Sequence, residues 1–90
     1  MPRMLDRWSP DHPVAHAIRG GTDWFSAWQM QKGLPWVTLA QATGMRAKRF
    51  EAISRGDYIS RAELDALAIA WAVSSGDLIA SMPSPRRVVE

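Results

Sequence analysis

The sequence contains no cysteine among its 90 residues. This absence excludes a disulfide framework, a thiolate-ligated metal site and a cysteine nucleophile, and it agrees with a reducing compartment. The chain also lacks an apolar run near the roughly 18 residues of a membrane span. Its first residues, MPRMLDRW, do not contain the apolar segment of a signal peptide. We therefore expect a soluble cytoplasmic protein.

A catalytic or metal-binding constellation is missing as well. The sequence has no glycine loop of the phosphate-cradling kind and no evident pairing of a nucleophile with a base. His12 and His16 have the i, i+4 spacing of a metal chelate on a helix, but Asp11 is the one further ligand evident beside them. We expect no enzymatic activity, no metal site, no cofactor and no small-molecule ligand.

Net charge is also small, at +2, and does not by itself imply a nucleic-acid partner. The distribution of charge is more informative. Residues 44–61 contain five basic side chains against two acidic ones, whereas residues 62–85 contain three acidic side chains and no basic one. This pattern predicts a basic face on one side of the protein and an acidic opposite end.

Apolar residues and helix signals are abundant. Apolar residues make up 47% of the chain and five residues are tryptophan, which is enough for one small folded domain. Apolar and polar residues do not alternate as they would in strands, so the expected fold class is all-α. Trp24, Trp28 and Trp71 are expected in the core, whereas Trp36 and Tyr58 are not assigned to it.

Start and stop signals predict the first three of five core helices. Thr22 is expected to cap the first helix, which ends at Gly33. Pro35 starts a second helix over residues 36–43, because proline is favoured where a helix begins. A third helix is expected over residues 46–54.

Two capping boxes predict the remaining core helices. In each, a serine stands three residues before a carboxylate that can bond back to its backbone N–H: Ser60 with Glu63, and Ser74 with Asp77. Prolines end the last helix, and residues 83–90 are a C-terminal tail whose last five residues are expected to fray.

Residues 1–21 are expected to form an N-terminal extension of a core domain that spans residues 22–82. Asp11 is expected to cap a short helix over residues 12–19. Two small apolar stripes are present in the extension: Val14, Ala17 and Ile18 in the helix, and Met4, Leu5 and Trp8 before it. The extension can pack on the domain, pair with a second subunit, or reach along DNA as an arm. Its mixed charges favour the first two.

The stretch Leu39–Gly56, LAQATGMRAKRFEAISRG, organises the rest of the chain. Gly44 separates two helical segments, because glycine adopts the left-handed conformation that ends a helix. Met45 follows as a buried hinge residue. In the second segment Phe50 and Ile53 face inward, while Lys48, Ala52 and Arg55 face outward. A helix, a glycine turn and a second helix with a basic outer face are the plan of a DNA-reading helix-turn-helix.

Over residues 24–79 the chain resembles the lambda repressor/Cro-like (XRE-type) helix-turn-helix family. The resemblance is carried by LAQATGM, by Phe50, Ile53 and the Arg55-Gly56 pair, and by LDALAIAWAVSSGDLI. It implies a compact five-helix domain whose third helix enters the major groove of double-stranded DNA. It also implies a transcriptional regulator that binds a pseudo-palindromic operator as a homodimer.

The resemblance implies a DNA-contacting role for eight residues. Ala47, Lys48 and Ala52 fall at base-facing positions, and Arg46 and Arg49 fall at the groove edge. Arg55 to Tyr58 corresponds to a backbone-contacting loop, and Trp36 stands where the family has a phosphate-contacting glutamine. Lysine can donate to guanine, and an alanine methyl can lie against a thymine methyl.

The family pattern also changes at four structural positions. Pro35 and Arg46 replace side-chain caps, and Gln29 and Ser54 stand in place of a buried arginine–glutamate pair. Because both members of that pair are replaced, no buried charge is left without its partner.

A second function remains open, a protein-interaction module such as an antitoxin or adaptor that reuses the fold. An exposed apolar patch around Trp8, Val14 and Ile18, without DNA affinity, would favour it. Glu51 has two interpretations as well: it accepts from a cytosine amino group, or it pairs with Arg55 four residues on.

Overall fold

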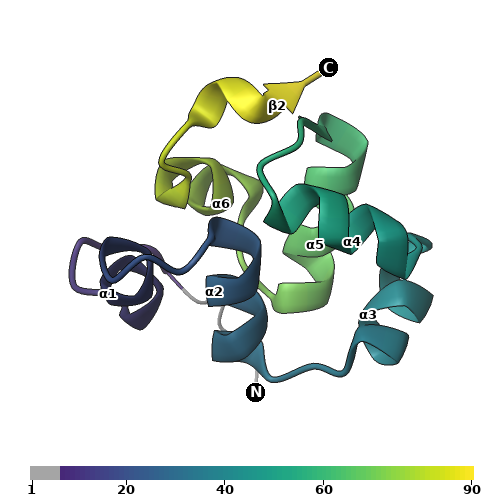
Figure 1. Ribbon diagram of the computed structural model, residues 1–90, viewed down its shortest axis with the longest axis horizontal. Coiled ribbons are helices and arrows are strands. Elements are labelled where there is room, and N and C mark those ends of the chain that lie inside the picture. Colours follow the sequence, from purple (N-terminus) through teal and green to yellow (C-terminus); the bar gives the residue numbers. More distant parts are fainter. Residues whose placement is uncertain (1–6) are drawn as a thin grey trace.

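The computed structural model describes residues 7–90, which are mostly helical with one small sheet (Figure 1). The elements in chain order are α1 (Pro13–Arg19), α2 (Trp24–Lys32), α3 (Trp36–Thr43), α4 (Ala47–Ser54), β1 (Ile59–Ser60), α5 (Arg61–Trp71), α6 (Ser75–Ser81), the 3-10 helix η1 (Pro85–Arg87) and β2 (Val88–Val89). All five expected core helices and the expected N-terminal helix are present. None of the helices in this part of the chain combines the length and apolar character needed to cross a membrane.

Two predicted caps are off by one residue. Helix α2 is capped by Asp23, not Thr22, because the Asp23 carboxylate accepts the backbone N–H of Ser26 at 2.9 Å. Helix α1 is capped by His12, whose Nδ1 accepts the backbone N–H of Val14 at 3.1 Å, and not by Asp11. At each helix start two neighbouring residues have side chains that can accept a capping hydrogen bond. The backbone conformation at the helix start determines which of the two is the cap.

Residues 7–21 of the N-terminal extension pack on the core, which confirms one of the three alternatives for this segment. Figure 1 shows α1 beside α2. Val14 is buried in the main core, and Trp8 and Ile18 are partly buried against it. The Trp8 ring lies 6.1 Å from the ring of Trp28. These three residues therefore do not form the exposed apolar patch that would have favoured an interaction module. Met4 and Leu5 lie outside the described residues.

A tryptophan cluster with one shared hydroxyl forms the centre of the core. The Trp24 and Trp28 indole N–H groups both donate to Ser81 Oγ, at 2.8 and 2.9 Å. The Ser81 hydroxyl donates in turn to the Leu78 carbonyl at 2.7 Å. Trp71 packs against both indoles, with ring centroids 5.9 and 6.3 Å away. The prediction that all three tryptophans are core residues is confirmed.

Both serine-led helix starts are present, although the second differs in detail. Ser60 and Glu63 form the complete reciprocal capping box at the start of α5. At α6, Ser74 accepts the backbone N–H of Asp77 as expected. The Asp77 carboxylate, however, accepts the backbone N–H of Trp8 at 3.1 Å. It therefore ties the N-terminal segment to α6.

The C-terminal tail is ordered in the fold, so the prediction of fraying is wrong. Strand β2 pairs in parallel with β1, with Ile59 opposite Val88 and Ser60 opposite Val89. The protein is mostly helical, as the all-α expectation required, but it also contains this one small parallel sheet. Strands of two residues are too short to show an alternating pattern, and their pairing joins segments far apart in the sequence.

Candidate nucleic-acid interface

A rigid turn joins α3 to α4. Gly44 has a φ of 73°, the left-handed conformation expected from the sequence. The Thr43 hydroxyl donates to the Leu39 carbonyl at 2.7 Å, and its oxygen accepts the backbone N–H of Met45 at 3.2 Å. The sequence predicts that Met45 is buried, but in the structure this side chain is only partly buried. These bonds determine the direction in which α4 leaves α3.

Helix α4 has the two faces that the sequence predicted. Phe50 and Ile53 are fully buried, and the Phe50 ring stacks on Phe25 with centroids 5.4 Å apart. Most of the predicted DNA-contacting residues lie outward: Arg46, Ala47, Lys48, Arg55 and Tyr58 are exposed, and Ala52 is half-buried. Their helix is therefore fixed to the core from behind.

A hollow of about 580 Å³ lies on the outer side of α4. It is bounded by the α3–α4 turn, by the outer face of α4 and by the start of α5. Its lining residues are Gly44, Met45, Arg46, Lys48, Arg49, Ala52 and Glu63. Three of these carry positive charge, so the hollow has a net positive lining.

The start of α4 adds further positive character to this surface. Arg46 occupies the N-cap position, and its side chain makes no capping hydrogen bond. The first backbone N–H groups of a helix have no acceptor within the helix, and the helix dipole makes this end partially positive. Helix α3 also begins without a side-chain cap, after Pro35. Both helix starts suit negatively charged groups such as phosphates.

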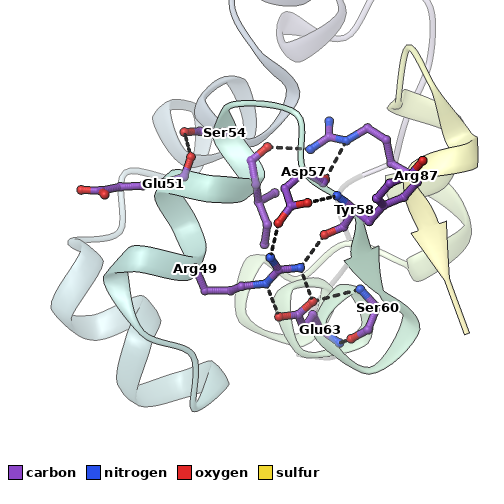
Figure 2. A network of polar contacts seen from close by, with 9 residues as sticks. Arg49, Glu51, Ser54, Asp57, Tyr58, Ser60, Glu63 and Arg87 are labelled. Carbon is purple, nitrogen blue, oxygen red and sulfur yellow. Dashed lines mark hydrogen bonds and ion pairs between the residues drawn. The ribbon is translucent and has the colours of Figure 1, made fainter.

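Arg49 behaves differently from its neighbours, because its guanidinium bonds within the protein (Figure 2). Its Nε donates to Glu63 at 2.6 Å and its Nη1 donates to Asp57 at 2.7 Å. Its Nη2 donates to Glu63 at 3.0 Å and also to the Tyr58 carbonyl. From the sequence, Arg49 is expected to contact DNA at the groove edge. The structure places most of its donors on acceptors of α5 and of the loop after α4.

The Arg49 bonds shift the titration of both carboxylates. The hydrogen bond from Arg49 is the largest influence that lowers the pKa of Glu63, with smaller help from Ser60. The same guanidinium lowers the pKa of Asp57, aided by the backbone N–H of Tyr58. The two carboxylates in turn raise the pKa of Arg49. The three groups therefore stay charged around neutral pH.

Acidification is expected to weaken this network and destabilise the protein. Because the folded pKa values are lowered, the two carboxylates contribute stability above their ordinary values of 4.5 for Glu63 and 3.8 for Asp57. That contribution is lost as pH falls through the lower folded values. Urea unfolding followed from neutral pH to about pH 3 tests this. Arg49→Ala should show a shallower acid decline, and an equal decline in both proteins would contradict the assignment.

Trp36 and the Arg55–Tyr58 loop frame the α4 surface. Trp36 is 38% exposed, and its ring packs edge-to-face with Phe25 and Phe50, with ring centroids 6.1 and 5.6 Å apart. It therefore covers the core at the start of α3. Tyr58 is 61% exposed.

Within the described chain Glu51 and Arg55 form no ion pair, so their predicted pairing is wrong.

Two important side chains were missed by the sequence analysis. Arg87, from the predicted frayed tail, donates to backbone carbonyls of α4 and of the following loop. Gln29 bridges elements, donating to the Leu34 carbonyl and accepting the Trp71 indole N–H at 3.2 Å. No local sequence signal identifies either role. The acceptors of Arg87 are 30 and 34 residues away in the sequence, and Trp71 is 42 residues away from Gln29.

The two histidines have structural contacts within the N-terminal extension. His12 supplies the cap of α1 and is buried against Trp8 and Trp28. His16 is exposed and hydrogen-bonded to Arg19 at 3.0 Å. In residues 7–90 no three histidine or acidic side chains are grouped as metal ligands.

Comparisons with protein-family models, with curated proteins and with solved structures found no match to this chain. A functional assignment for the α4 surface therefore depends on its residues and their geometry.

Proposed function

We propose that the protein is a cytoplasmic, sequence-specific DNA-binding transcriptional regulator of the lambda repressor/Cro-like kind, without catalytic activity. The single observation that supports this most is the arrangement of α4. Its apolar side is locked into the core by Phe50 and Ile53, while Arg46, Ala47 and Lys48 point to solvent. A helix presented in this way has the dimensions that the major groove accepts.

Each outward residue has a role in the proposed complex. Lys48 donates to guanine, and the methyl groups of Ala47 and Ala52 lie against thymine methyls. Arg46 and the uncapped start of α4 contact phosphates at the groove edge. Arg49 orients α4 through its bonds to Glu63 and Asp57 and does not itself contact DNA.

Two further contacts frame the helix. Arg55 and Tyr58 follow α4 in an exposed loop and are assigned to the DNA backbone. Trp36 lies at the start of α3 with part of its ring system exposed, and its indole N–H is assigned to a phosphate. Phosphate contacts of this type determine register and make binding strongly dependent on salt.

We propose a homodimer on a pseudo-palindromic operator, and the small size of the reading surface supports it. Helix α4 has eight residues, so one copy reads few base pairs. Two copies can bind one face of the duplex at half-sites one helical turn, about 34 Å, apart. The dimer then makes twice as many DNA contacts as one copy.

Selection of bound genomic fragments by the purified protein tests this function. The expected result is enrichment of a short inverted repeat, with affinity that falls steeply as salt rises. Failure to enrich any sequence, together with absence of salt-dependent DNA binding, would exclude the regulator.

An interaction module of the antitoxin or adaptor type is the second candidate. It is favoured by exposed apolar side chains that do not line the hollow on α4: Met30, Val37 and Ile69 are 71%, 70% and 83% exposed. In that case the selection recovers no sequence, and the protein co-purifies stoichiometrically with a protein partner that covers one or more of these side chains.

A further inference from the structure

The C-terminal segment lies against the end of the proposed DNA-reading helix. Strand β2 pairs with β1, which begins directly after Tyr58. From the turn before β2, Arg87 reaches back to α4 and its following loop (Figure 2). The tail and the loop are therefore joined both by backbone pairing and by one side chain.

Arg87 donates to two backbone carbonyls, one in the last turn of α4 and one in the loop that follows it. Its Nη2 donates to the Ile53 carbonyl at 2.6 Å, and its Nε donates to the Asp57 carbonyl at 3.1 Å. The last carbonyls of a helix lack intrahelical donors, and the helix C-terminus favours a cation. The planar guanidinium can bridge two acceptors in a defined geometry.

The loop residue Asp57 is held from two sides. Arg49, on α4, binds its carboxylate, while Arg87, from the tail, binds its carbonyl. Arg55 and Tyr58, which flank this position, remain exposed. The loop backbone is thus held by two arginines, and its two proposed DNA-contacting side chains point outward.

We propose that Arg87 is a positioning residue for DNA binding, which holds the Arg55–Tyr58 loop in register with α4. This inference rests on the proposed function. Arg87 acts through the loop backbone and does not touch DNA, because its bonded nitrogens face carbonyls of its own chain. The neighbouring Arg86 is exposed and makes no such bonds to described residues. It is therefore a control of equal charge from the same turn.

The first arm of the test is a double-mutant cycle on the selected operator. Arg87→Ala should weaken binding roughly tenfold, about the loss of one charged hydrogen bond, whereas Arg86→Ala should change affinity by no more than about twofold. In an Arg55→Ala background, Arg87→Ala should have a smaller effect than in the wild type, because one of the two contacts that it positions is already absent. Arg87→Lys keeps the charge but cannot donate to both carbonyls in the same planar geometry. Its loss of affinity should therefore be similar to that of Arg87→Ala.

The second arm needs no DNA. The backbone N–H groups of Gly56 and Asp57 are hydrogen-bonded to the Ile53 and Ala52 carbonyls, so their hydrogen exchange reports loop order. Arg87→Ala and Arg87→Lys should speed exchange at these two amides, while Arg86→Ala should not. A thermal melt of each variant identifies any global unfolding.

The outcomes separate this inference from the proposed function. If wild-type protein binds the operator and Arg87→Ala behaves like Arg86→Ala, or if the effects of Arg87→Ala and Arg55→Ala are additive, the positioning role is overturned. Unchanged exchange at Gly56 and Asp57 overturns it too. If the wild-type protein binds no DNA, the proposed function fails and the DNA-positioning role fails with it. Faster exchange in Arg87→Ala would then still support the contact with the loop.

Discussion

Lys48→Ala is expected to weaken operator binding by about 1–3 kcal/mol, roughly 5- to 150-fold, while the fold stays intact. Lys48 is exposed on the outer side of α4 and lines the positively charged hollow. It forms no hydrogen bond or ion pair with any described residue, so its ammonium is available to a ligand. If Lys48 reads guanine, its loss removes base recognition as well as charge.

Comparison of operator and random DNA, by fluorescence anisotropy at several salt concentrations, measures this effect. The loss should be larger on the operator than on random DNA. Arg86→Ala, which removes one exposed positive charge outside α4, is the matched control and should affect neither DNA strongly. An equal loss on both DNAs would show that Lys48 contacts a phosphate and does not read a base.

Ser81→Ala is expected to destabilise the protein strongly, by about 2–6 kcal/mol. The Ser81 oxygen accepts two indole N–H groups, from Trp24 and Trp28, and all three side chains are buried. Its removal leaves two buried donors without their acceptor, and each such group costs about 1–3 kcal/mol. That loss is a large fraction of the total stability of about 5–15 kcal/mol expected for a small domain.

Urea unfolding monitored by tryptophan fluorescence measures this loss, with Ser84→Ala as control. Ser84 is exposed and its side chain makes no capping bond to η1. The control should lie within about 0.5 kcal/mol of wild type. A Ser81→Ala protein as stable as the control would show that the two indoles find other acceptors.

The arginines on and beside α4 show why a sequence pattern alone does not identify a DNA contact. Arg49, Arg55 and Arg46 are chemically alike and lie on or beside one helix, so a helical wheel treats them similarly. Arg49 differs because Glu63, 14 residues away, and Asp57, 8 residues away, lie within hydrogen-bond distance of it. Whether a surface cation is available to DNA therefore depends on acceptors that come from other elements.

For the aromatic residues too, burial can be predicted from the sequence, whereas their hydrogen-bond partners depend on the tertiary packing. That Trp24, Trp28 and Trp71 are buried follows from their helical spacing and apolar bulk. That one serine hydroxyl serves two of the three indoles depends on the packing of α6 against α2, more than 50 residues apart in sequence. Gln29 likewise reaches Trp71 across 42 residues.

Local patterns in the chain predict the helices, their approximate ends, the inward face of α4 and the basic character of its outer side. These features depend on residues within about four positions of each other, through caps, glycine turns and helical periodicity. Other features become visible only in the folded protein: the packing of α1, the parallel pairing of β2, the bonds of Arg49 and the contact of Arg87 with a carbonyl 34 residues away. They depend on donors and acceptors that meet only when the whole chain has closed around its core.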